Sequence, residues 1–350
     1  MVTLSLNSAP SALRRPVCEL SFGTSPAGDW QRALTWVRIQ AGLAPFVDVA
    51  EVGLAAGGWE PQVALGDTGT IKLGYEDSGA DLVFSGQVQA LRHNLDGTLV
   101  VTAVNGGGLL SRLRLNQAYE KQKAGDIVRD LAGRAGVSTG NLQSGSDFPY
   151  IILDDRRSAY QHIAVLGRKC GFYAYISPDG KLAFGPLTAG QPTQTFAYGA
   201  DILAIETRQG QALLGSVSAI GEGAAGSQGS DAWSWLIKDP AQVSASAGSG
   251  DPQRQAPDAA MRSQSSAQSA ADGAQQMAGL YSVIGRLLVP GAPAAVVGGT
   301  VQIQDVPSPG LSGACLVRQL QHAYNKNAGF TTHLELSASS GGPGSLGGLL

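Results

Sequence analysis

Charge is scarce in this sequence. Lys, Arg, Asp and Glu make up 15% of the 350 residues, and the formal net charge is −3. Because a dedicated nucleic-acid-binding protein normally carries a basic face, this balance argues against that class. No window reaches the roughly 18 unbroken apolar residues of a membrane helix, and the N-terminus lacks the apolar core of a signal peptide. We therefore expect a soluble protein without a membrane anchor.

Cysteine is scarce as well, with three residues, Cys18, Cys170 and Cys315. They are odd in number, far apart and without metal-ligand spacing, which predicts reduced, partly buried thiols and neither a metal nor another cofactor. Glycine, in contrast, occurs 48 times. A charge-poor, glycine-rich composition is typical of many strands and turns rather than long surface helices.

The clearest helix signals lie in the middle of the chain, between residues 119 and 186. Ile127, Leu131 and Ala135 recur at helical spacing, and Gly136 ends that run. After a polar loop at 138–147, a second helical run ended by Gly171 carries on one face Ala159, Ile163, Leu166 and Cys170. An SPDG turn then joins two short β segments into a hairpin. Helix, loop, helix and hairpin predict a compact α/β module of about seventy residues.

β-type segments flank this module on both sides. Three strands are expected before residue 55, at 17–22, 33–39 and 46–54. The cleanest alternation follows: Ile71 and Leu73 point one way while Thr70 and Lys72 point the other, which is typical of a sheet with one wet face. An NLDG turn at 94–97 then predicts a hairpin.

The segment after residue 186 repeats this pattern. GTVQI at 299–303 echoes GTIKL at 69–73, and LQH at 320–322 echoes LRH at 91–93. In both copies an Asn/Gly turn and a final alternating strand follow. Order, spacing and strand phase agree, so we infer an internal duplication; the alternative is two unrelated hairpins that share turn chemistry.

Between the two copies the sequence changes character. Residues 221–255 are rich in small and polar residues, with Trp233 and Trp235 as the large anchors, which predicts a long inserted loop that orders on binding a neighbour. Residues 257–280 predict an alanine-rich helix. The last stretch, 338–350, predicts a tail that is flexible unless a partner holds it.

An ordered set of short motifs runs from about residue 34 to residue 337. The first part holds VFSGQV at 83–88, DIVRDLA at 126–132, Tyr160 with residues 166–172, and DGKLAF at 179–184. The second part holds VPG at 289–291, VQI at 301–303, YN at 324–325 and GFTT at 329–332. Together with the order of segments, this set resembles the late control protein D family of contractile phage tails, the N-terminal part of VgrG spikes and the T4-type baseplate hub.

The resemblance implies an α+β, mainly β fold with two β-barrel-like tube domains and an intervening small α/β module. The expected boundaries are 1–116 for the first tube domain, 117–190 for the module, 191–337 for the second tube domain with an insertion at 221–280, and 338–350 for the tail. Longer members of the family continue into spike domains that this sequence lacks. We therefore expect the spike to be a separate polypeptide.

The resemblance also implies a function, that of a structural baseplate hub. Such a hub is a homotrimer whose two similar barrels per chain present six similar units to a six-subunit tube, while a three-fold spike binds below. The expected partners are the chain itself, a hexameric tail tube protein, a trimeric spike, and other baseplate or tape-measure proteins. DNA or a protein cargo would pass through the channel without specific binding. The protein would be made in the bacterial cytoplasm and assembled into a virion, tailocin or injection particle.

Two sets of candidate site residues follow. Polar strand positions are expected to face the channel or its wall, where a low charge density lets cargo slide; these are Thr70, Lys72, Thr300 and Gln302. A mild basic zone near the first helix and the anchors of the inserted loop are expected to bind partners; these are Arg112, Arg114, Trp233 and Trp235.

Catalytic sites are not expected. The cluster at 154–157, Asp-Asp-Arg-Arg, is typical of a helix cap that balances the helix dipole. Adjacent acids also point apart, so a paired-acid catalytic site would need a partner from elsewhere in the chain. Cys170 lacks the His/Asn context of a nucleophile. The histidines show no metal-ligand spacing; they are His93, His162, His322 and His333. Two of these, His93 and His322, are expected at equivalent positions of the repeat. The rival functions are a tail-tip cell-wall hydrolase and a carbohydrate-binding adhesin module.

Two glycine runs also invite a ligand interpretation. Neither 57–58 nor 106–108 is followed by the Lys-Ser/Thr of a phosphate-binding loop. Both are therefore expected to be turns or flexible links.

Overall fold

The computed structural model describes residues 14–55, 57, 61–187, 190–210, 214–221, 243–280, 283–307 and 312–338. Over this part of the chain it contains twenty strands and five helices. The fold is thus α+β and mainly β, as the sequence predicts. The predicted tail lies outside the described residues apart from Ala338.

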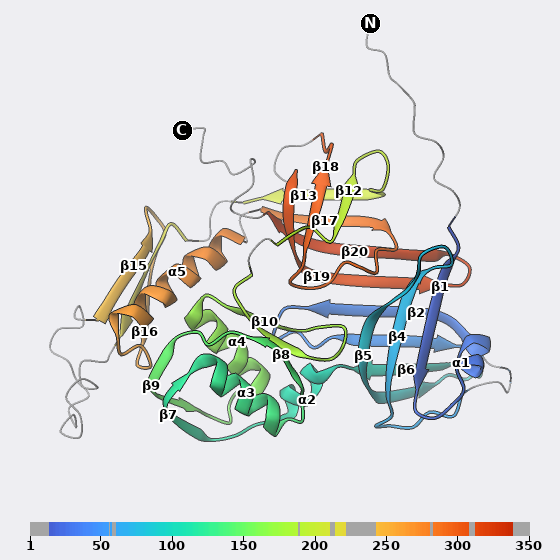
Figure 1. Cartoon of the computed structure of the whole chain (residues 1–350), viewed down its shortest axis with the longest axis horizontal. Helices are drawn as coiled ribbons and strands as arrows, with labels where there is room; N and C mark the ends of the chain where they lie inside the picture. The colour runs from blue at the N-terminus through green and yellow to red at the C-terminus, as the bar shows by residue number, and fades with distance from the viewer. Residues whose placement is uncertain are drawn as a thin grey trace, which may run out of the picture.

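Six strands build the first half of a twelve-stranded sheet, and we call them the first repeat (Figure 1). They are β1 (Pro16–Phe22), β2 (Leu34–Gly42), β3 (Val49–Leu54), β4 (Thr68–Tyr75), β5 (Gly79–His93) and β6 (Leu99–Val104). Their order in the sheet is β1-β4-β5-β6-β3-β2. In Figure 1, β1 and β4 run across β2 and β6, so apolar side chains of all six strands meet in one core, into which α1 (Ala27–Ala33) inserts Trp30.

The second half of the sheet contains six more strands, which we call the second repeat. They are β12 (Gln194–Ala197), β13 (Ala204–Gln209), β17 (Val283–Pro290), β18 (Thr300–Gln304), β19 (Gly313–Asn325) and β20 (Gly329–Ala338). Their order is β12-β18-β19-β20-β17-β13. Numbered by their place in the chain, the strands of both repeats follow the same order, 1-4-5-6-3-2. The repeats differ in the direction of one pairing, because β1 and β4 are antiparallel whereas β12 and β18 are parallel.

An irregularity in the strand pairing aligns the two repeats residue by residue. The pairing of β5 with β6 shifts just before Ala90, and that of β19 with β20 shifts just before Gln319. The residues that follow, 91–93 and 320–322, therefore correspond. The duplication inferred from the sequence is confirmed in strand order, and the match of LRH with LQH is confirmed in register.

The match of GTIKL with GTVQI is right in phase but wrong by two residues. Thr70 pairs with Ser85, three residues before Val88. At the corresponding place in the second repeat, three residues before Val317, Ala314 pairs with Gln302 rather than with Thr300. A shift of two residues leaves every side chain on the same face of the strand. The sequence pattern therefore did not reveal the shift.

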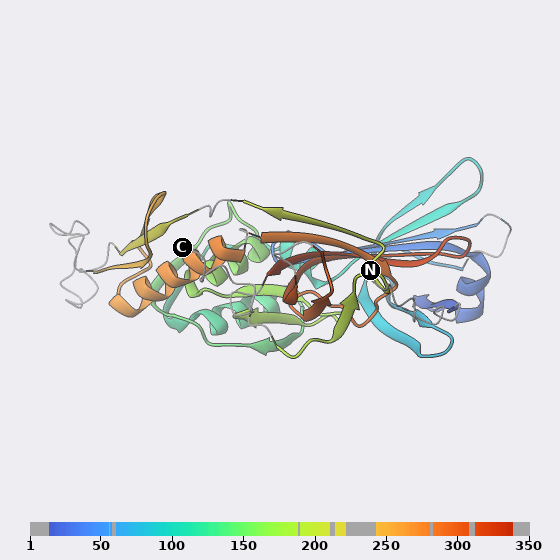
Figure 2. The same cartoon turned by 90° about the horizontal axis from the view of Figure 1, so that it is seen from above.

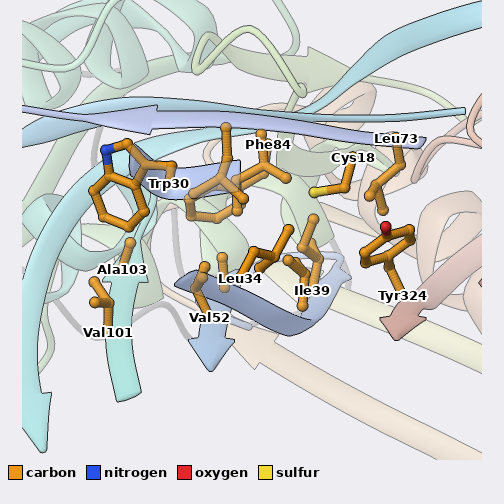
Figure 3. Packing of buried hydrophobic residues seen from close by; sticks show 14 of the residues in the cluster. Cys18, Trp30, Leu34, Ile39, Val52, Leu73, Phe84, Val101, Ala103 and Tyr324 are labelled. Atoms are coloured by element: carbon orange, nitrogen blue, oxygen red, sulfur yellow. The ribbon is translucent and has the colours of Figure 1, made fainter. Parts of the chain in front are cut away.

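The two repeats join into one sheet because β2 pairs with β19, from Gly42 opposite Gln319 to Trp36 opposite Asn325. Each repeat keeps an apolar core of its own. The hairpin of β19 and β20 reaches over the join, so that Tyr324 and Phe330 belong to the core of the first repeat. Figure 3 shows Tyr324 in that core together with Cys18 and Leu73.

A small α/β module lies between the repeats in the chain. Its elements are α2 (Gly106–Arg112), β7 (Gln117–Lys123), α3 (Ala124–Arg134), β8 (Thr139–Leu142), β9 (Asp147–Leu153), α4 (Ala159–Cys170), β10 (Tyr173–Ile176) and β11 (Leu182–Gly185). Helices and strands share one core. Both predicted helices and the predicted hairpin are present, and Gly171 ends α4 in the left-handed conformation with φ of 68°.

Three local predictions in the module are wrong. The glycine run at 106–108 is the start of α2 rather than a link, because the Asn105 side chain accepts a hydrogen bond from the N–H of Gly107 and caps the helix. The predicted loop at 138–147 contains β8, which pairs with β11. The cap of α4 is Ser158, in a capping box with Gln161, and not the acidic cluster before it.

An insertion between β13 and β17 has no counterpart in the first repeat. It consists of β14 (Ser216–Gly221), β15 (Ser244–Gly248), β16 (Gln253–Asp258) and α5 (Gln264–Leu280). The predicted loop at 221–255 thus contains strands at its described end, and the predicted helix begins at Gln264 rather than at residue 257. In Figure 2 the insertion and the module occupy one end of the elongated molecule and the first repeat the other.

Candidate assembly surface

The predicted wall residues of β4 lie on the polar side of their strand. Ile71 and Leu73 are fully buried, whereas Lys72 is exposed and its Nζ lies 4.0 Å from a carboxylate oxygen of Glu19. Thr70 is half-buried and lines a groove of about 840 Å³ between the first repeat and the module. Arg112 lines the same groove, so the structure brings together one predicted wall residue and one predicted partner-binding residue.

The predicted wall residues of β18 behave differently. Thr300 is only 3% exposed, because the segment before β12 covers it: its hydroxyl accepts a hydrogen bond from the N–H of Gly190, and its carbonyl accepts one from the Thr193 hydroxyl. Thr300 is therefore covered by its own chain and does not face solvent in the protomer. Gln302 is half-buried, while Val301 and Ile303 fill the core as expected.

A larger polar surface extends over both repeats, on the side of the sheet opposite the cores. We call it the polar sheet face; strand register places its members side by side on β3, β2, β19, β20, β17 and β13. They are Glu51, Arg38, Gln40, Gln321, His333, Glu335, Arg286 and Glu206. Part of this face is hollowed into a shallow depression of about 490 Å³.

Most charges of the polar sheet face lie close to an opposite charge. Arg38 lies 3.6 Å from Glu51 in the first repeat, and Arg286 lies 3.8 Å from Glu206 in the second. These two pairs occupy equivalent positions with the charges exchanged between the strands. Arg318, at the edge of the face, lies 3.5 Å from Glu335. These three ion pairs leave the named part of the face polar but nearly neutral.

Sequence reasoning missed this face although a signal was present. The order Val37-Arg38-Ile39-Gln40 alternates as clearly as the stretch around Thr70. The alternation does not reveal which strand pairs with this one. The amide of Gln40 donates to the side chain of Gln321 at 2.9 Å, and the two residues are 281 positions apart in the chain.

The predicted partner-binding residues differ in their surroundings, and their role stays a prediction. Arg114 is exposed, yet its guanidinium donates to the backbone carbonyls of Asp155 and Arg156, so it holds a loop of its own module. Arg112 is exposed at the end of α2. Trp233 and Trp235 lie outside the described residues.

A buried polar junction connects the first repeat to the module. Asp48 is 4% exposed and accepts hydrogen bonds from the N–H of Gly42 and, at 2.6 Å, from the Asn105 amide that also caps α2. Burial raises the pKa of Asp48 to about 8, against the opposing effect of these donors. His322 lines the same narrow space and is 1% exposed. Burial lowers its pKa to about 4, so the ring is neutral at pH 7 and shares a 2.9 Å hydrogen bond with the Thr332 hydroxyl.

The remaining candidates for chemistry have structural surroundings. Asp154 and Arg156 pair within their own turn, and His162 is buried with its Nε2 2.7 Å from the Asp154 carbonyl oxygen. All three cysteines are free and buried, as predicted, and burial raises the pKa of the Cys170 thiol.

No group of three or more His, Cys, Asp or Glu side chains within the described ranges could hold a metal ion. In the same ranges, no helix is long and apolar enough to cross a membrane.

Comparisons with known proteins bear on the fold. No protein-family model matches the sequence, and no curated protein matches it significantly. Solved structures do match over almost the whole chain. The 43 kDa tail protein of prophage MuSo2 from Shewanella oneidensis superposes with a TM-score of 0.69 at 13% identity, covering 92% of this chain and 98% of that one.

Two further structures show the same likeness. A tail protein from Neisseria meningitidis gives a TM-score of 0.68 at 12% identity, covering 93% of this chain and 97% of that one. A component of the E. coli type VI secretion system, described as structurally similar to the phage T4 tail proteins gp27 and gp5, gives 0.61 at 10% identity, covering 92% and 77%. At these identities the likeness concerns the fold: this chain has the fold of phage tail proteins and of a type VI secretion component.

Proposed function

We propose that this chain is the structural hub of a contractile tail or injection machine, assembled as a homotrimer that joins a six-fold tube to a three-fold spike. The observation that carries the proposal is the repeat of six strands in the same order within one continuous sheet. Three such chains present six similar units, so a three-fold assembly can match a six-fold one. The shared fold with tail proteins supports the same conclusion.

We further propose that the polar sheet face, rather than the β4 side chains of Thr70 and Lys72, lines the channel. It runs over six neighbouring strands, two of the first repeat and four of the second, and a channel wall shared by both repeats needs such a continuous surface. Because unpaired Lys and Arg side chains bind phosphates in a salt-dependent way, its charge pairs would leave DNA or a protein cargo free to slide. The outer partners would be the tube protein, the spike and other baseplate proteins, in a phage or injection particle. No catalytic step is part of this function.

The oligomeric state tests the hub. Light scattering of the purified protein, alone and with its tube and spike proteins, should give complexes containing three chains of 35.9 kDa each. A single chain under all of these conditions would contradict the proposal. Clearing of peptidoglycan in a zymogram would instead favour the hydrolase.

Charge substitutions test the lining. Replacing the paired carboxylates by Glu51→Gln and Glu206→Gln would leave Arg38 and Arg286 unpaired, and passage of DNA or cargo should slow while the trimer still forms. Glu19→Gln, which leaves Lys72 of β4 without its neighbouring carboxylate, is the matched control and should leave passage unchanged. If the control alone affects passage, the channel is lined by β4.

A further inference from the structure

The two repeats contact each other along one pair of strand edges, that of β2 with β19. In the second repeat, residues 319–325 of β19 lie between β20 and β2. The corresponding part of the first repeat, residues 90–93 of β5, pairs with β6 alone, since β4 pairs with β5 only up to Gln87. Over the described part of the chain, no strand pairs with its other edge.

The same comparison leaves a second open edge. β2 has β3 on one side and β19 on the other. Its counterpart β13 pairs with β17 and is the last strand of the sheet. An unpaired strand edge is a template for another strand. The described chain thus contains the β2–β19 contact once. The two strands that would make an equivalent second contact, β13 and β5, do not pair with each other.

Exposed apolar side chains mark both open edges. Five large apolar residues are exposed in the described chain, and three of them adjoin these edges: Leu65 precedes the glycine whose N–H donates to Val88 of β5, Leu95 lies in the turn after β5, and Leu203 directly precedes β13. Leu65 is 66% exposed. Isolated exposed apolar residues are ordinary, but their gathering at two edges indicates surfaces that a partner covers.

The residue of the second repeat that corresponds to Leu65 shows how a neighbouring strand buries this position. Leu65 precedes Gly66, whose N–H donates to Val88, and Val297 precedes Gly298, whose N–H donates in the same way to Val317. Yet Val297 is 5% exposed, in a core against which Ala41 and Leu43 of the β2 edge pack.

The same contrast holds along the strands themselves. Leu320 and His322 are 5% and 1% exposed, and β2 pairs with both of them, through Ala41 and Ile39. Their counterparts, Leu91 and His93, are half-buried and exposed. The first repeat therefore lacks at this edge the cover that β2 gives to the second.

Strand register also fixes which residues of β13 correspond to those of β2. Arg38 is opposite Glu51 on β3, and Glu206 is opposite Arg286 on β17. Counting along both strands then aligns Ile39 with Thr207, and Gln40 with Arg208.

We propose that β13 of one protomer pairs antiparallel with the free edge of β5 in a neighbouring protomer, repeating between chains the contact that β2 and β19 make within one chain. The proposal rests on the homotrimeric hub and names its interface. The contact is heterologous, so each protomer offers one edge and accepts another, as a closed ring requires. The equivalent register places Thr207 opposite His93 and Arg208 opposite Arg92.

This register has a consequence for the energetics. Arg92 and Arg208 would be like charges on directly opposite residues, which disfavours pairing. Backbone hydrogen bonds and the burial of Leu65, Leu91 and Leu203 must therefore stabilise the contact.

Disulfide cross-linking tests the pairing. Gln40 and Gln321 occupy the equivalent site within one chain, 2.9 Å apart at their side-chain tips. The double variant Arg92→Cys/Arg208→Cys should, on mild oxidation of the purified trimer, give covalent species of two and three chains in a non-reducing gel. The native cysteines are buried and should not interfere. Gln40→Cys/Gln321→Cys is the positive control and should close within one chain, without a change in mass.

The matched negative control is Arg92→Cys/Arg286→Cys, in which the second cysteine is on β17, one strand away from the edge. Because a disulfide needs Cα atoms within about 7 Å, this control should give on the order of tenfold less cross-linked product. Equal cross-linking of both double variants would overturn the proposal. If Arg92→Cys/Arg208→Cys misfolds, His93→Cys/Thr207→Cys makes the same test at the neighbouring pair.

The two proposals fail in different ways. A trimer in light scattering that yields no interchain disulfide from either pair would overturn the β13–β5 contact and leave the hub intact. A protein that remains monomeric with its tube and spike proteins would overturn the hub, and the interface with it.

Discussion

The two repeats share one strand order but differ in what surrounds them. The second repeat receives β2 along β19, so Leu320 and His322 are buried. The first repeat has no strand at the equivalent edge, and its own LRH stretch stays accessible. The same topology therefore gives a core position in one repeat and a surface position in the other. Burial here is a property of the neighbouring strand rather than of the repeat itself.

The repeats also differ in what they carry. The insertion of β14, β15, β16 and α5 occurs only in the second repeat, and it reaches the module: α5 packs on α4, and Lys169 of α4 forms an ion pair with Asp258. Burial lowers the pKa of that lysine to about 8. The second repeat is thus tied to the module through an element that the first does not have.

The largest effect should come from truncating equivalent leucines. Leu320→Ala removes a buried side chain and should lower the free energy of unfolding by about 2–5 kcal/mol. Leu91→Ala, at the half-buried counterpart, should cost the isolated protomer about 1 kcal/mol or less. Urea denaturation of both variants measures the difference, and equal losses would contradict the stated alignment of the repeats. In the assembled trimer, Leu91→Ala should weaken association instead.

The next effect concerns pH. Because His322 has a pKa of about 4 when folded and about 6.5 when unfolded, the unfolded state binds more protons in between. Its contribution to stability is therefore present above pH 6.5 and is lost as the pH falls to 4, by an amount on the order of 3 kcal/mol. His322→Gln should flatten the stability profile in that window and leave the profile above pH 7 parallel to that of the wild type. Asp48 remains in both proteins and does not affect the comparison.

A smaller effect should follow from breaking the insertion that only the second repeat has. A Cβ atom at Gly273 of α5 would lie 2.4 Å from the Cα of Gly171, the residue that ends α4. Gly273→Ala should thus force the helices apart and cost about 1–3 kcal/mol in thermal or chemical unfolding. Gly279→Ala on the same helix meets no atom within 4 Å and should be neutral or slightly stabilising. A loss of stability in the control alone would exclude the close helix contact.

The smallest effect should come from charge reversal in the proposed contact between β13 and β5 of neighbouring chains. Arg208→Glu or Arg92→Glu would replace a like-charge pair by an opposite-charge pair and should strengthen trimer formation by about 0.2–1 kcal/mol for each contact. The double reversal should return association close to the wild-type value. Analytical ultracentrifugation across concentrations measures all four proteins, and two additive single effects would argue that the residues do not face each other.

Local chemistry made much of the fold predictable. The alternation of Ile71 and Leu73 with Thr70 and Lys72, the turn before β11 and the stop at Gly171 all depend on neighbours a few residues away. For the same reason the duplication was visible, since both copies keep their strand phase. The fold of the glycine run at 106–108 was not predictable, because the Asn105 side chain that caps it is held by Asp48, from the distant loop before β3.

The sequence by itself determined many of the strands with their inward and outward sides, the helices and hairpin of the α/β module and the repeated strand pattern, because each depends on short-range spacing. The tertiary structure alone decided that Thr300 is covered by the segment before β12, that the polar sheet face joins strands from both ends of the chain, and which edges remain open. These outcomes depend on which strands become neighbours. Since backbone hydrogen bonds form equally well between many pairs of strands, that choice is made by the packing of the whole chain and not by any local pattern.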